Sequence, residues 1–178
     1  MSENRVDPTV AGLYLVGFVT LFFGLLGILT FLGSADATFA GDAAVELLFP
    51  VGAVMIVLAY MAGKAGNAFA TALFAFIGVA FLAINAGAFV GSSIGAYAAA
   101  IFFIIFAIVA FIIGAPKLLA ILLLLVALFF LFFGFAGAAT SVDAAEVYAA
   151  AYGLFSFVAF IVATYLAVAL GTQKMPVF

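Results

Sequence analysis

The chain has 178 residues and a formal net charge of −3, and 71% of its residues are apolar whereas only 6% are charged. This composition excludes a domain that faces water on all sides, because too little polar surface is left to cover it. The absence of cysteine and histidine removes disulfides, thiolate chemistry and the commonest metal ligand. We expect a membrane protein that is not an enzyme, has no metal site and no cofactor, and has the lipid bilayer rather than nucleic acid as its partner.

Six apolar blocks separated by short polar connections predict an all-α, polytopic bundle of six transmembrane helices in a single domain over residues 1–178. The second block follows an acidic stretch and contains Pro50, which we place in the first turns of its helix, where a missing N–H is tolerated. Continuous apolar runs of about twenty residues exclude a barrel of short alternating strands. The predicted spans are 10–32, 45–61, 68–90, 94–113, 118–138 and 147–170.

Threading these spans through a membrane separates the charged side chains by sign. One side receives Glu3 and Asp7 together with every basic residue, namely Arg5, Lys64, Lys117 and Lys174. The opposite side receives only acids, namely Asp36, Asp42, Glu46, Asp143 and Glu146. Because cytoplasmic loops carry an excess of Lys and Arg, we predict that both termini are cytoplasmic and that the protein lies in the cell membrane.

Small residues recur along the spans and predict close helix packing. The glycines that thin the helices are Gly12, Gly17, Gly24, Gly27, Gly134 and Gly137. Glycine lets the backbones of membrane helices approach closely, and we expect these positions to serve packing rather than substrate binding.

Polar groups inside the predicted spans are few and uncharged. They are Thr20, Thr30, Thr71, Asn85, Ser156 and Thr164. Hydroxyls of this kind usually bond to their own preceding turn, whereas Asn85 needs a partner helix, water or a solute. A pump that binds a metal cation or relays protons normally keeps ionisable residues at mid-membrane, and none is present here. The pattern favours a small solute that is neutral or enters as its protonated acid.

Three segments carry recognisable patterns. Gly66-Asn67-Ala68-Phe69 precedes Phe74 and Gly78, Asp7-Pro8 precedes Gly12-Leu13, and Tyr165-Leu166-Ala167 precedes Met175-Pro176. They resemble the G-N-T-F signature, the N-P-x-x-L-G-L motif, and the last helix and tail of the acetate uptake transporter family, the succinate-acetate permeases. The chain departs from the family at Asp7 and Ala68, and Met55 and Ala62 stand where the family has Gln and Glu. For Asp7 we keep two roles open, a helix cap or a substrate contact, whereas for Asn67 we expect a cap.

The resemblance also implies an apolar constriction along a substrate pathway. Of the family's Phe, Leu and Tyr, only the leucine is kept, as Leu125, and the other two positions hold Val16 and Ile77. Neighbouring Phe18 and Phe76 can replace them if the register slips. The resemblance further implies a homo-hexamer in which each protomer has its own pathway.

The expected function is a channel or a transporter such as a proton symporter for small monocarboxylates such as acetate, or for succinate. Two alternatives stay open at this point. One is a urea or short-amide channel, and the other is a membrane scaffold that transports nothing.

Overall fold

The computed structural model describes residues 7–34, 37–85, 93–173 and 175–176, with side chains described outside 37–45 and 83–85. These residues form six α-helices and no strand, which confirms the predicted all-helical fold. The helices are α1 (Pro8–Phe31), α2 (Ala37–Lys64), α3 (Ala68–Asn85), α4 (Ser93–Ile112), α5 (Lys117–Ala138) and α6 (Val142–Thr172).

Five of the helices, all except α3, are long and apolar enough to cross a membrane. Helix α3 is apolar and is described over 18 residues, and the end of the third predicted span, 86–90, lies outside the described residues. Large apolar side chains such as Phe102, Ile108 and Phe111 of α4 lie exposed on the outside of the bundle. A surface of this kind is stable in lipid and not in water, so the chain is a membrane protein.

The start of α2 differs from the sequence-based prediction. The helix begins at Ala37 and not near residue 45, so it includes the acidic stretch that we expected to be a connection. Pro50 therefore lies inside the helix, 13 residues beyond its first residue, and not in its first turns. Proline has no N–H to donate to the carbonyl of Glu46, one turn earlier, and membrane helices tolerate this loss where neighbouring groups or water compensate.

Helix α6 also begins earlier than predicted, at Val142 and not near residue 147. The Ser141 side chain caps it by accepting a hydrogen bond from the Ala144 N–H at 3.3 Å. Asp143 lies in the first turn, where the positive end of the helix dipole favours a carboxylate. The acidic residues therefore did not mark the start of this helix, because a capped first turn that contains acidic side chains is itself helical.

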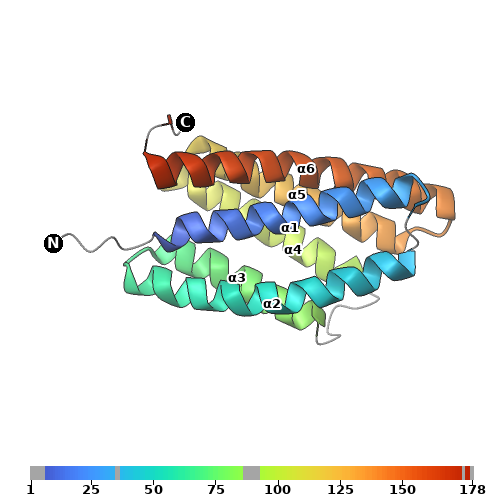
Figure 1. Cartoon of the computed structure of the whole chain (residues 1–178), viewed down its shortest axis with the longest axis horizontal. Helices are drawn as coiled ribbons and strands as arrows, with labels where there is room; N and C mark the ends of the chain where they lie inside the picture. The colour runs from blue at the N-terminus through green and yellow to red at the C-terminus, as the bar shows by residue number, and fades with distance from the viewer. Residues whose placement is uncertain (1–6, 35–36, 86–92, 174, 177–178) are drawn as a thin grey trace.

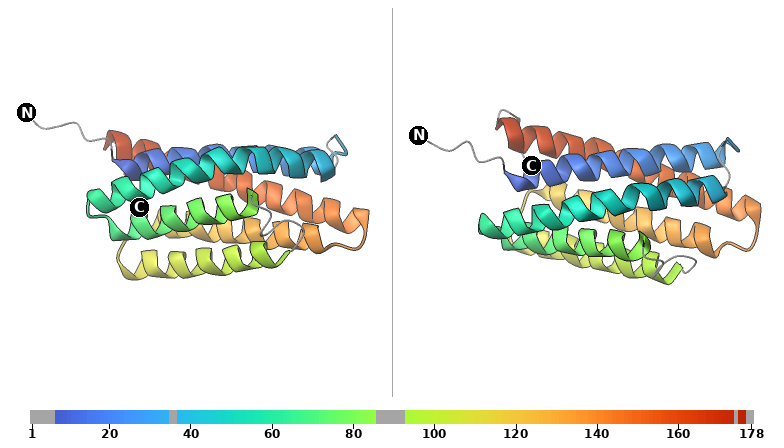
Figure 2. Two further views of the ribbon diagram at one scale, coloured as in Figure 1. Left: turned by 90° about the horizontal axis from the view of Figure 1, so that it is seen from below. Right: turned by 60° about the horizontal axis from the view of Figure 1, so that its bottom comes forward.

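The six helices form a closed ring in chain order. Each helix packs against the next one, and α6 returns to pack along α1 (Figures 1 and 2). Helix α1 begins and α6 ends at the same end of the bundle. Because successive helices run in opposite directions, α1, α3 and α5 are parallel to one another, and all three begin at this end.

Glycine brings α1 and α6 together along most of their length. A Cβ atom placed on Gly27 would lie 2.6 Å from the carbonyl oxygen of Ala149 and 2.7 Å from the Cα of Gly153. One placed on Gly24 would lie 3.1 Å from the backbone nitrogen of Phe157, and one on Gly17 3.2 Å from Oγ1 of Thr164. The predicted packing role is confirmed at Gly24 and Gly27, where a larger side chain would press on the backbone of α6, and at Gly17, where it would press on the Thr164 side chain.

Other pairs of helices also pack closely at single glycines. Gly52 of α2 and Gly78 of α3 face each other, and a Cβ atom on either would lie about 3 Å from the carbonyl oxygen of the other. Gly134 of α5 accommodates the ring of Tyr97 from α4. Glycine thus allows close backbone approach in two pairs of neighbouring helices and makes room for an aromatic ring in a third.

Phenylalanine rings fill much of the remaining space between the helices. Phe23 of α1 contacts Phe129 of α5, with ring centroids 5.2 Å apart, and Phe103 of α4 stacks on Phe130 of α5 at 5.4 Å. The seam between α3 and α4 contains rings as well, including Phe69 against Phe106 at 6.0 Å. Such pairs add to the packing energy by about 0.5–1.5 kcal/mol each beyond their burial.

The two ends of the bundle carry opposite charge among the described side chains. Lys64 at the end of α2 and Lys117 at the start of α5 lie at one end, which we name the basic end. Asp143 and Glu146, in the first turns of α6, lie at the other, the acidic end. Asp7, the cap of α1, lies at the basic end as predicted, and Glu46 lies nine residues beyond the first residue of α2, in the half of that helix nearer the acidic end. The separation predicted from sequence is confirmed for these residues; Glu3, Arg5, Asp36, Asp42 and Lys174 lie outside the described side chains.

We expect Gly27→Ala to destabilise the bundle by about 1–3 kcal/mol, the usual cost of overpacking, because backbone atoms of α6 cannot move aside separately. The measurement is the thermal midpoint of helix loss by circular dichroism in detergent. Gly137→Ala is the matched control, since its Cβ would lie 3.6 Å from the Ser93 hydroxyl, an ordinary contact. The control should keep or slightly raise the midpoint, because alanine favours a helix over glycine. Equal midpoints for both variants would contradict the assigned role of Gly27.

Candidate functional site

The residues predicted to form an apolar constriction lie at one level of the bundle. Val16 lies eight residues beyond the first residue of α1, and Leu125 lies eight residues beyond that of α5. Ile77 lies nine residues beyond the first residue of α3. These three parallel helices begin at the basic end, so at about 1.5 Å per residue all three side chains lie roughly 12–14 Å along their helices. Ile77 is buried, and Val16 and Leu125 are half-buried against the core.

The two aromatic substitutes considered for this constriction face elsewhere. Phe18 is 54% exposed on the outer surface of α1, so within one chain it does not line the interior. Phe76 is directed to α4, where its ring lies 4.8 Å from that of Phe102 and 5.6 Å from that of Phe103. The structure therefore places Val16, Ile77 and Leu125 at a common level, with Phe76 in the seam beside them.

Asn85, the most polar candidate within a span, is the last residue of α3. Its side chain lies outside the described residues.

The Asp7-Pro8 motif begins α1 as a helix cap. The Asp7 carboxylate accepts a hydrogen bond from the Thr9 N–H at 2.8 Å, and Pro8 is the first residue of the helix. A carboxylate at this position satisfies a free N–H, and proline at the next position has no N–H that needs a partner. The capping role of Asp7 is confirmed.

Asn67 caps α3 in the same way and also reaches α1. Its side-chain oxygen accepts a hydrogen bond from the Ala70 N–H at 3.0 Å, which confirms the predicted cap. Its amide nitrogen donates to the Thr9 hydroxyl at 3.4 Å and so links the starts of α1 and α3. Gly66, which precedes it, has φ of +78°, a conformation that favours glycine and completes the turn from α2.

The remaining motif residues pack at the same end of the bundle. The ring of Phe74 occupies the space over Gly12, where any side chain would collide with it. Leu13 is buried in the core, and Phe69 pairs with Phe106 across the seam between α3 and α4. The Tyr165 hydroxyl donates to the carbonyl of Pro176 at 2.9 Å and fixes the chain that follows α6. Three segments that are distant in sequence thus converge at the basic end.

Three hydroxyl side chains are buried among the described residues: Thr20, Ser156 and Tyr152, whose hydroxyl bonds to the Thr30 side chain. The Thr20 hydroxyl donates to the carbonyls of Val16 and Gly17 at 2.8 and 3.1 Å, which is the self-bonding expected for it. The Ser156 hydroxyl instead crosses from α6 to the carbonyl of Thr20 at 2.9 Å. The sequence-based prediction missed this bond and the close contact at Gly153. Gly153 and Ser156 are three residues apart and so lie on one face of α6, and this spacing could have indicated a packing face.

The described side chains include no group of three acidic residues that could hold a metal ion. Buried polar atoms of the described side chains all have hydrogen-bond partners. The interior of this part of the chain is therefore mostly apolar, and its buried hydroxyl groups have partners.

Comparisons of the chain with protein-family models, with curated proteins and with solved structures found no match.

We expect Asn67→Ala to lower stability by about 1 kcal/mol, the usual cost of losing a helix cap. Asn67→Asp keeps the acceptor for the Ala70 N–H but has no amide to donate to Thr9. It should therefore recover most of the loss. Both variants can be compared with wild type by denaturant titration in detergent micelles. A full loss in the aspartate variant would show that the bond to Thr9, and not the cap, is the stabilising contact.

Proposed function

We propose that this membrane protein passes small monocarboxylates such as acetate across the cell membrane, with both termini in the cytoplasm. The observation that carries the proposal is the contact between two of the three family-like segments, those that begin α1 and α3, at the end of the bundle where the third segment also lies (Figure 1). Asn67 bonds to Thr9 beside the Asp7 cap, and Phe74 packs on Gly12. Residues that resemble one family's motifs therefore support one another in space, as expected if the motifs maintain a shared architecture.

The chemistry of the interior supports an uncharged form of the substrate. An anion in an apolar interior costs many kcal/mol without a fixed partner, and the buried polar groups of the described side chains are the uncharged hydroxyls of Thr20, Ser156 and Tyr152. Acetic acid carries its own proton, so it needs no carboxylate or lysine from the protein. We therefore propose that each acetate crosses together with a proton and that transport is electroneutral.

The level defined by Val16, Ile77 and Leu125 is the proposed barrier. It lies roughly 12–14 Å along parallel helices, close to the middle of a hydrocarbon core about 30 Å thick. An apolar constriction at this depth blocks water and ions and admits a small neutral molecule. By the same resemblance, the working unit is a hexamer with one pathway in each protomer, and succinate is a second candidate substrate.

A membrane scaffold without a pathway is the competing function that a specific observation favours. The core between the helices is filled by rings such as Phe23, Phe129 and Phe130, and the buried hydroxyls already have partners. A scaffold of this kind predicts no solute flux at all.

Acetate uptake into proteoliposomes tests the proposal. An acidic outside should accelerate the uptake of radiolabelled acetate relative to protein-free liposomes, which report the passive leak of acetic acid. A membrane potential imposed without a pH gradient should have no effect, because the neutral acid carries no net charge. Uptake equal to the protein-free leak would favour the scaffold, and uptake that ignores the pH gradient would contradict electroneutral transport.

The barrier itself is tested by Leu125→Ala. Removing three carbons from the Leu125 side chain should widen the constriction and raise acetate flux. It should also weaken the selectivity for acetate over larger acids such as butyrate. Ile121→Ala is the matched control, because Ile121 lies one turn earlier on α5 and is 46% exposed. Urea flux measured in the same liposomes separates the monocarboxylate proposal from a urea channel. Identical flux and selectivity in both variants would remove Leu125 from the pathway.

A further inference from the structure

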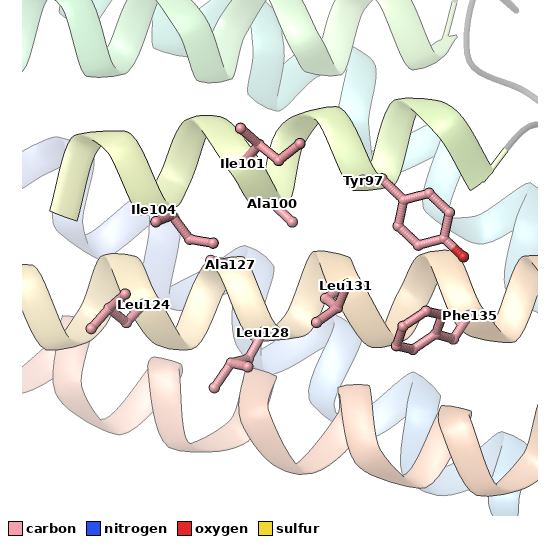
Figure 3. Close-up of a pocket in the computed structure, with 9 residues that line it drawn as sticks. All are labelled: Tyr97, Ala100, Ile101, Ile104, Leu124, Ala127, Leu128, Leu131 and Phe135. Carbon is pink, nitrogen blue, oxygen red and sulfur yellow. The ribbon is translucent and has the colours of Figure 1, made fainter. Parts of the chain in front are cut away.

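A groove runs along the outside of the bundle between α4 and α5 (Figure 3). It has a volume of about 510 Å³ and is lined by four residues of α4, from Tyr97 to Ile104, and five of α5, from Leu124 to Phe135. Apart from the Tyr97 hydroxyl, every lining side chain is a hydrocarbon. We propose that this groove binds one acyl chain of a bilayer phospholipid from the leaflet at the acidic end. The proposal is independent of the transported substrate.

The groove exists because two alanines face each other across the helix pair. Ala100 of α4 and Ala127 of α5 are buried and form its floor, whereas Ile104 and Leu124 stand beside them as larger walls (Figure 3). Small side chains opposite each other leave a channel that the neighbouring helices do not fill. A flexible hydrocarbon chain of a lipid has the shape and the apolar surface to occupy it.

The length and depth of the groove match one leaflet. From Leu124 to Phe135 the groove follows eleven residues of α5, or about 16 Å at a rise of 1.5 Å per residue. Half of a hydrocarbon core about 30 Å thick is about 15 Å. Because α5 ends at Ala138, this half is the one at the acidic end.

The groove opens onto the surface that the bilayer covers. Ile101, Ile104 and Leu124 are each more than 40% exposed, and they belong to the same apolar surface as the rest of α4. Water has no reason to remain in such a groove, because a bound water needs two to four polar partners. The groove is therefore continuous with the interface between protein and lipid, and the occupant that this interface supplies is an acyl chain.

Aromatic residues mark the end at which a headgroup would lie. The Phe135 ring is 5.7 Å from that of Tyr97 and 5.5 Å from that of Tyr148 on α6. Tyrosine favours the boundary between hydrocarbon and headgroups, where its ring is buried and its hydroxyl is wet. Asp143 and Glu146 precede Tyr148 by five and two residues at the start of α6. Their negative charge opposes an anionic headgroup, so the bound lipid is zwitterionic.

Native mass spectrometry of the purified protein tests this site. Wild type is supplied with equal amounts of dioleoyl phosphatidylethanolamine and dioleoyl phosphatidylglycerol. It should retain one lipid per chain, with the zwitterionic lipid in excess. Ala100→Leu fills the floor of the groove and should lose that lipid, whereas the matched control Ala72→Leu, at an exposed position of α3, should keep it. No retained lipid in wild type, or equal retention in both variants, would overturn the proposal.

A second measurement on wild type does not depend on whether Ala100→Leu folds. Phosphatidylethanolamine with a diazirine in the middle of one acyl chain is photolysed in proteoliposomes, and the labelled residues are mapped by peptide sequencing. Label should concentrate in 97–104 and 124–135. Uniform label over the exposed faces of all helices would overturn the site. A lipid-free dimer with its contact in the groove would show that a second copy is the occupant.

Discussion

The structure depends on the close contact between α1 and α6, the two helices that are farthest apart in sequence. Gly17, Gly24 and Gly27 allow the backbone of α1 to lie against α6, and Ser156 adds a hydrogen bond to the carbonyl of Thr20. In lipid the hydrophobic effect does not drive helices together, so contact area and such bonds must do so. Because this contact closes the ring, it also sets where α3 and α5 stand relative to α1, and hence the level shared by Val16, Ile77 and Leu125.

The other contacts of the ring divide into two physical kinds. Glycine allows backbone approach between α2 and α3, at Gly52 and Gly78, whereas the seam between α3 and α4 is filled by rings such as Phe69 and Phe106. Backbone contacts are rigid, because main-chain atoms cannot move independently of their helix. Aromatic rings can change rotamer. The seam that contains Phe76 is therefore the more deformable part of the ring, and it adjoins the proposed barrier.

The motif residues connect the ends of helices and do not form a polar cavity. Asp7 and Asn67 cap α1 and α3, and the bond from Asn67 to Thr9 ties the two helix starts together. Free N–H groups at a helix start are costly near a membrane, so these side chains have a structural task at the basic end whatever the function of the protein. The substrate-facing part of the proposed function then depends on the apolar level deeper in the bundle, and the groove between α4 and α5 concerns lipid alone.

The sequence by itself determined the helical class, the six helices, the cap at Asn67 and the separation of charge, because hydropathy, capping and charge act locally along the chain. For Asp7 it left a cap and a substrate contact open, and the structure shows the cap. It placed the starts of α2 and α6 too late, since a polar segment outside the hydrocarbon can still be helical, and so it put Pro50 in the wrong part of its helix. Only the tertiary structure decided that Phe18 faces outward, that Phe76 lies in a seam, and that α1 and α6 meet through Gly27 and Gly153. Those facts depend on how each helix is rotated about its axis. Spans that are apolar on all sides carry almost no periodic signal from which that rotation can be read.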